Sequence, residues 1–77
     1  MATLRLALAQ VNPTVGDLLG NRALVVETTA AAVGRGADLV AFPEMMLTGY
    51  PIEDLALRPS FQRASAHGLE QLASDLD

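Results

Sequence analysis

Two short apolar runs that flank a helical segment limit most strongly what this chain can fold into. Residues 3–11 alternate around Arg5 and then become apolar, which predicts a β-strand that ends near Gln10. Residues 18–33 show helical periodicity, and residues 38–42 form an apolar run typical of buried parallel strands. A strand, a connecting helix and a second parallel strand make a βαβ unit, whose crossover is expected to be right-handed.

The helical segment carries signals for both of its ends and for one buried face. Asp17 follows a turn rich in Asn, Pro and Gly and is a typical N-cap residue. Gly34 and Gly36 supply a stop signal, and Arg35 between them complements the helix dipole from the last turn. Spacings of four and three predict a core-facing stripe, which consists of Leu19, Ala23, Val26, Ala30 and Val33.

The second half of the chain predicts a loop and two helices. Pro43 ends the second strand and is followed by the loop. Pro51, with the acids Glu53 and Asp54 behind it, indicates a helix start that has the proline in its first turn. We expect Ser60 to cap a last helix, whose imperfect apolar stripe consists of Phe61, Ala64, Leu69, Leu72 and Leu76.

The number of strands is too small for a complete α/β sheet. Two parallel strands of the buried type would leave open edges and an uncovered apolar face. The 77 residues allow one small domain at most, and 51% of them are hydrophobic, which is too many for a disordered segment. We therefore expect the N-terminal part of a larger α/β domain, loosely folded or prone to aggregate on its own. The alternative is a complete small module that is finished by self-association and unfolds cooperatively.

Composition excludes several classes of function. The chain has no cysteine, and all five basic residues are arginine, set against nine acids for a net charge of -4. With two Phe, one Tyr and no Trp, it lacks the basic, aromatic surface of a nucleic-acid-binding protein. The apolar run at residues 6–9 is shorter than the roughly 7–15 residues of a secretory signal core or the roughly 20 of a membrane span. We therefore expect a cytoplasmic protein that binds neither nucleic acid nor membrane.

Candidate chemistry lies beyond the carboxyl ends of the two strands, where open α/β sheets collect functional residues. Gln10 and Asn12 follow the first strand, and Glu44 follows the second. A carboxylate held directly after a buried strand and Pro43 would be partly desolvated, as suits a general base. Position alone, however, favours a surface glutamate in a loop. For Gln10 and Asn12, hydrogen bonds to turn backbone are a better explanation than contact with substrate.

Several motifs together resemble one enzyme superfamily. The sequence FPE at residues 42–44, followed by LTGYP at residues 47–51, is similar to the nitrilase, or carbon–nitrogen hydrolase, superfamily. The pattern GYPxEDLxLRPxF over residues 49–61 resembles more narrowly the glutaminase domains of glutamine-dependent NAD+ synthetases. The opening AQxNPxxGD over residues 9–17, with Asn21 four residues on, fits the same group. The resemblance implies that the chain is the N-terminal βαβ-plus-helices portion of a nitrilase-like αββα sandwich.

The resemblance implies a glutaminase mechanism with one of its three catalytic residues in this chain. The superfamily uses a glutamate, a lysine and a cysteine, and Glu44 matches the glutamate, which is the general base toward a cysteine that this chain lacks. A positioned base of this kind contributes about 10²–10⁴-fold to the rate. Tyr50 is implied to border the substrate pocket, with a half-buried loop tyrosine as the alternative. Because lysine and cysteine are missing, we expect the 77 residues alone to be inactive.

The resemblance also implies substrates and a larger reaction. L-glutamine would be hydrolysed to glutamate and ammonia, and the ammonia would serve the ATP-dependent amidation of deamido-NAD+ at a synthetase domain outside these residues. ATP and Mg2+ belong to that domain, so no cofactor is expected here, and the full-length protein is expected to be a homo-oligomer. Another amidase of the superfamily, acting on a small amide or carbamoyl compound, is the second possibility. A non-catalytic, self-associating α/β module is the third.

The remaining titratable side chains have structural explanations. A metal site built from the acids Glu44, Glu53 and Asp54 would lack a histidine partner, so no metal is expected. His67 lies within the last predicted helix, far from Glu44 in sequence, and is expected to face solvent.

Overall fold

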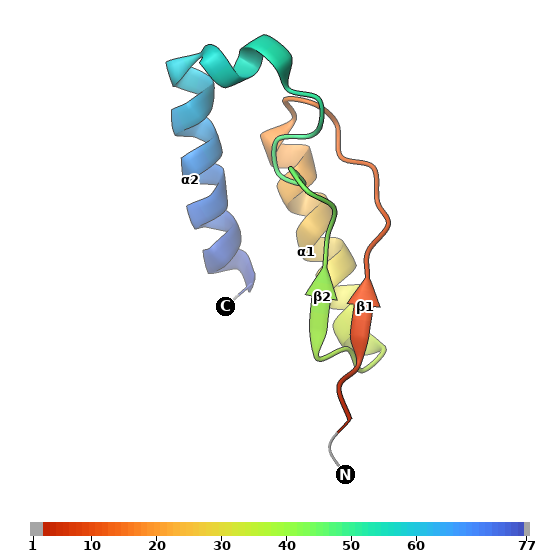
Figure 1. The fold of residues 1–77 in the computed structure, drawn as a ribbon. Helices are drawn as coiled ribbons and strands as arrows, with labels where there is room; N and C mark the ends of the chain where they lie inside the picture. Colours follow the sequence, from red (N-terminus) through yellow and green to blue (C-terminus); the bar gives the residue numbers. More distant parts are fainter. Residues whose placement is uncertain (1–2, 77) are drawn as a thin grey trace.

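The chain forms a small α/β arrangement in which a βαβ unit is followed by two further helices. The computed structural model describes residues 3–76. The βαβ prediction and the parallel pairing of its strands are confirmed (Figure 1). The elements are β1 (Leu6–Leu8), α1 (Leu18–Gly34), β2 (Leu39–Ala41), the 3₁₀ helix η1 (Glu53–Leu57) and α2 (Pro59–Leu76).

The sheet contains two parallel strands of three residues each. Ala7 lies opposite Val40 in the register, and the two strands run in the same direction with α1 behind them, so the crossover is right-handed (Figure 1). The Ala9 N–H extends the pairing with a hydrogen bond of 2.9 Å to the carbonyl of Ala41. The strands are shorter than the apolar runs because regular pairing lasts only while both chains stay side by side, and the first diverges into its loop after Ala9.

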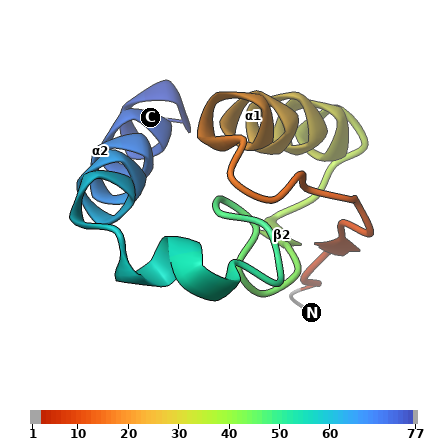
Figure 2. The same cartoon turned by 90° about the horizontal axis from the view of Figure 1, so that it is seen from above.

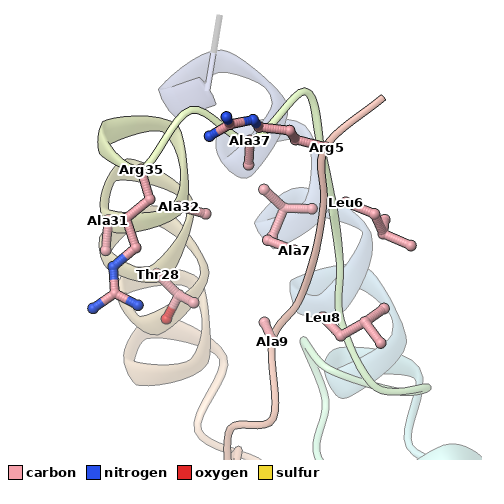
Figure 3. Close-up of a pocket in the computed structure, with 11 residues that line it drawn as sticks. Arg5, Leu6, Ala7, Leu8, Ala9, Thr28, Ala31, Ala32, Arg35 and Ala37 are labelled. Atoms are coloured by element: carbon pink, nitrogen blue, oxygen red, sulfur yellow. The ribbon is translucent and has the colours of Figure 1, made fainter. Parts of the chain in front are cut away.

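One face of this sheet is covered and the other is bare. Ala7 and Val40 line the space against Thr28 and Ala32 of α1. On the opposite face Leu6, Leu8 and Leu39 are exposed, and Figure 3 shows Leu6 and Leu8 pointing away from α1. The expectation that a two-stranded sheet leaves an apolar face uncovered is therefore confirmed.

The ends of α1 are where the sequence predicts them. The Asp17 carboxylate caps the helix by accepting a hydrogen bond of 2.9 Å from the Gly20 N–H. At the other end Gly36 has a φ of +86°, and its N–H donates to the carbonyl of Val33 at 2.9 Å. A left-handed residue at this position closes the helix, which explains the glycine. Arg35 lies just past the last turn as the C-cap residue, rather than within that turn.

The predicted core face of α1 is wrong. Leu19 and Val33 are 71% and 60% exposed, and only Val26 of the predicted stripe is even half-buried. The buried positions are instead Asn21, Val25 and Ala32. The helix α1 carries apolar residues of its own on nearly every side, so their spacing does not select the face that becomes buried. The sheet and the hydrogen bonds of Asn21 select it.

The segment after β2 follows the predicted order with two corrections. Residues 44–48 form turns, and η1 has Glu53 and Asp54 in its first turn, where acids favour the helix dipole. Pro51 precedes the helix, because Ile52 is the N-cap residue. The last helix, α2, begins at Pro59, so Ser60 lies inside its first turn and is not the cap. Proline suits the first helical position because its missing N–H would have no partner there.

The apolar stripe of α2 is only partly correct. Phe61 and Leu72 are half-buried, whereas Ala64, Leu69 and Leu76 are exposed. The face that packs also contains Gly68, which is buried, and Ser65, which is half-buried. Small residues occupy this face because the loop after β2 lies close to it.

The buried core is thin. Within residues 3–76 the buried hydrophobic side chains are Val25, Ala32 and Met46. Figure 2 shows α1 over the sheet, with α2 beside α1 rather than over the strands. Arg22 and Asp75 join the two helices by an ion pair of 3.4 Å, a partly exposed contact that contributes little to stability. Neither helix of the described part has the length and apolar character needed to cross a membrane.

Candidate active site

The carboxyl ends of the two strands open into one hollow of about 600 Å³. The segment after β1 forms one wall, and Pro43, Glu44 and Tyr50 from the segment after β2 form the other. Gln10 and Asn12 lie in the first wall, so the residues predicted after each strand are brought to one place. Ligands of open α/β sheets bind at this edge. The hollow is therefore the candidate site.

Of the described residues that line this hollow, Glu44 alone is charged, and its side chain is exposed. This agrees with the surface glutamate that position alone favours, whereas the expectation of a partly desolvated carboxylate is wrong. Among residues 3–76, the lining of the hollow thus presents a carboxylate without a cation beside it.

The backbone directly after Glu44 has an unusual conformation. Met45 has a φ of +55°, in the left-handed region that residues other than glycine rarely adopt. A residue held this way typically costs about 1–3 kcal/mol and persists only where its surroundings enforce it. Here the Gly49 N–H donates to the carbonyl of Met45 at 2.8 Å, and the next side chain, Met46, is buried. The turn that carries Glu44 is thus tightly closed and anchored.

The side chain of Asn21 joins the segment after β1 to the turn after β2, at Thr14 and Leu47, neither of which lines the hollow. Its Oδ1 accepts a hydrogen bond of 2.8 Å from the Thr14 N–H, and its Nδ2 donates to the carbonyls of Thr14 at 2.8 Å and Leu47 at 2.9 Å. The Gly16 N–H adds a bond of 2.8 Å to the carbonyl of Thr48. We call these bonds between residues 14–16, Asn21 and residues 47–49 the loop joint.

Close approach of the two backbones makes Gly49 necessary in the loop joint. Its φ is +80°, and a Cβ at this position would lie 2.6 Å from the Cα and 2.7 Å from the backbone N of Val15. Both neighbouring atoms belong to the main chain and cannot rotate away. Gly49 is therefore required by conformation and by space at the same position.

Tyr50 lies at the mouth of the hollow with 74% of its surface exposed. The alternative of a half-buried tyrosine packed under the next helix is wrong. Gln10 and Asn12 also differ from expectation: within residues 3–76 their side chains make no hydrogen bond to the turn backbone, and Asn21 does so instead. The sequence signal for Asn21 was an amide among apolar helical neighbours.

The other titratable groups lie away from the hollow. His67 is exposed on α2, as predicted. Glu53 and Asp54 lie in the first turn of η1. In the part of the chain that the structure describes, no three His, Cys, Asp or Glu side chains gather closely enough to hold a metal ion.

Comparison with known proteins decides the family. The model of the carbon–nitrogen hydrolase family matches residues 5–77. The chain belongs to the carbon–nitrogen hydrolase family. This confirms the superfamily expected from residues 42–51, whereas the complete αββα sandwich stays a prediction.

Individual members of the family give a narrower likeness. The chain is 49% identical over 73 residues to the glutamine-dependent NAD+ synthetase of Thermotoga maritima, which covers 95% of this chain. It is 46% identical over 72 residues to the same-named enzyme of Rhodobacter capsulatus and 44% identical over 71 residues to that of Synechocystis sp.. The aligned part spans 13% of the length of each of these relatives. The resemblance to glutamine-dependent NAD+ synthetases is therefore confirmed.

Proposed function

We propose that these residues are the first part of a glutaminase domain in a glutamine-dependent NAD+ synthetase. The observation that carries the proposal is the position of Glu44 at the carboxyl end of β2, in a hollow that faces the end of β1. The family match over residues 5–77 and 49% identity to a synthetase support the same conclusion. The cytoplasmic location and the homo-oligomeric state stay predictions.

In the proposed reaction Glu44 is the general base. Its carboxylate takes the proton from a cysteine thiol, because the thiolate and not the thiol is the effective nucleophile. The thiolate attacks the side-chain amide carbon of L-glutamine, and the Glu44 proton passes to the leaving nitrogen, which departs as ammonia. Water then cleaves the glutamyl thioester to release glutamate. Over the cycle, glutamine and water become glutamate and ammonia.

The cysteine and a lysine that stabilises the tetrahedral intermediate come from residues outside this chain, which contains neither residue type. The proposed use of the ammonia, ATP-dependent amidation of deamido-NAD+, also belongs to a domain outside it. We assign no residue of this chain to ATP or Mg2+. Tyr50, exposed at the mouth of the hollow, is the proposed contact for the substrate.

The test uses the full-length protein and replaces Glu44→Gln, which removes the base but keeps the shape of the side chain. We expect glutamine-dependent NAD+ synthesis to fall by about 10²–10⁴-fold, whereas synthesis from added ammonia stays within about twofold. The matched control is Glu53→Gln, an exposed glutamate of η1 outside the hollow, which should change neither rate.

Two outcomes would contradict the proposal. Retention of glutamine-dependent synthesis in Glu44→Gln would remove Glu44 from the role of base. Glutamine hydrolysis in a full-length protein that synthesises no NAD+ from ammonia would instead indicate an amidase without a synthetase activity.

A further inference from the structure

We propose that Asn21 is a positioning residue for Glu44, an inference that rests on the proposed glutaminase function. The loop joint contains one side chain that binds both the segment after β1 and the turn that carries Glu44, and that side chain is Asn21. It is the fourth residue of α1 and does not line the hollow. It therefore acts on the reaction through the backbone that carries Glu44.

The geometry of Asn21 leaves its amide little freedom. The residue is 2% exposed, Oδ1 accepts one hydrogen bond, and both hydrogens of Nδ2 are directed to carbonyl oxygens. Rotation of the amide by a half-turn would place Nδ2 against the Thr14 N–H and lose all three bonds. Because a buried polar group without partners is unfavourable, this single orientation is enforced.

The link from Asn21 to Glu44 is short and stiff. Leu47, whose carbonyl accepts from Asn21, lies three residues after Glu44 within the same turn. That turn is closed by the hydrogen bond between Gly49 and Met45 and is anchored by buried Met46. A shift at the carbonyl of Leu47 therefore moves the whole turn, with Glu44 at its start, relative to the wall formed by residues 10–13.

The substitution Asn21→Asp isolates this link. An aspartate has the same shape and can still accept from the Thr14 N–H. It offers no N–H, so a negatively charged oxygen would face the carbonyls of Thr14 and Leu47, which lie 2.8 and 2.9 Å from Nδ2. Packing of α1 on the sheet involves other residues, so the change acts mainly on the loop joint.

The experiment compares Asn21→Asp with Val25→Ala in the full-length protein. Val25 is 5% exposed and lies one turn further along α1, so its truncation loosens the same helix without touching the loop joint. We expect kcat for glutamine hydrolysis to fall by about 10–100-fold in Asn21→Asp, since a misplacement of about 1 Å can cost about 100-fold. Val25→Ala should stay within about threefold, and ammonia-dependent synthesis within about twofold in both.

A second readout separates positioning from general destabilisation. Gly49→Ala disturbs the same loop joint from the other side, so its effect on kcat should be strongly non-additive with that of Asn21→Asp. The pair Val25→Ala and Gly49→Ala should be additive. Asn21→Ser, whose hydroxyl can accept one bond and donate one, replaces Asn21→Asp if the latter does not fold.

Each outcome decides for or against the proposal. A kcat in the Asn21 variant equal to that of Val25→Ala, or additivity with Gly49→Ala, would overturn the positioning role. If the positioning role is overturned but Glu44→Gln abolishes glutamine hydrolysis in the same experiment, the proposed function still stands. If Glu44→Gln is fully active, the proposed function itself is wrong.

Discussion

Gly49→Ala should loosen the loop joint by an amount that the structure allows to be worked out. A new Cβ would lie 2.6 Å from the Cα of Val15, about 1 Å closer than two carbon atoms normally approach. An alanine would also adopt a φ of +80°, which costs about 1–2 kcal/mol for a residue with a side chain. The loops must therefore separate.

Separation removes interactions as well as relieving the clash. The hydrogen bond of 2.8 Å from the Gly16 N–H to Thr48 would lengthen, and such a bond contributes about 0.5–1.5 kcal/mol. Together with the strain at position 49, the loop joint should lose about 1.5–3.5 kcal/mol. Because each 1.4 kcal/mol is about tenfold, local opening should become about 10- to 300-fold more frequent.

Hydrogen exchange of the full-length protein measures this opening directly. The Gly16 N–H reports the bond between the loops, so a peptide that contains it should exchange faster by up to the factor above. A global unfolding curve is a poorer assay, since a protein of several domains does not unfold in two states.

Gly34→Ala is the matched control for the same chemical change. Gly34 is the last residue of α1, and a Cβ there would meet no atom within 4 Å. We expect exchange at Gly16 to be unchanged by it. Unchanged protection of Gly16 in Gly49→Ala, or equal deprotection in both variants, would refute the idea that close backbone approach fixes the glycine.

Two further changes test the helices. Asp17→Ala should destabilise the first turn of α1 by about 1 kcal/mol, because the hydrogen bond from the Gly20 N–H to the cap is lost. Asp17→Ser should restore most of this stability. Equal rates of hydrogen exchange in the two variants would contradict the role of Asp17 as the cap. Gly68→Ala should stabilise α2 by about 1 kcal/mol, because alanine favours the helix more than glycine does. The added Cβ would lie 3.6 Å from Leu47 Cδ2, which is an ordinary contact. Faster hydrogen exchange in α2 would show that there is no room for this Cβ.

The parts of the fold that depend on local chemistry could be predicted from the sequence. Asp17 and Gly36 define the ends of α1, and each does so by bonding a backbone group only three residues away. Their residue types were therefore sufficient to predict both ends of the helix. The buried face of α1 could not be predicted, because it depends on what packs against a helix that is apolar on most sides. Leu19, at 71% exposed, is the clearest case.

Of the candidate site, too, one part could be predicted from the sequence and another part could not. The meeting of Gln10 and Glu44 follows from the rule that parallel strands end at one edge, and the structure confirms it. The role of Asn21 could not be inferred, since its partner Leu47 is 26 residues away in sequence. The exposure of Glu44 agrees with the surface location that its loop position favours, although the strand-end rule itself says nothing about what lies over a residue.

The loop joint also has a consequence for how freely the sequence can change. Thr14, Leu47 and Thr48 contribute only main-chain atoms to the bonds between the loops, and those atoms are the same for almost every amino acid. Their side chains can therefore be replaced while the bonds that hold the two loops together are preserved. Strict demand for one residue type falls instead on Gly16, Asn21 and Gly49.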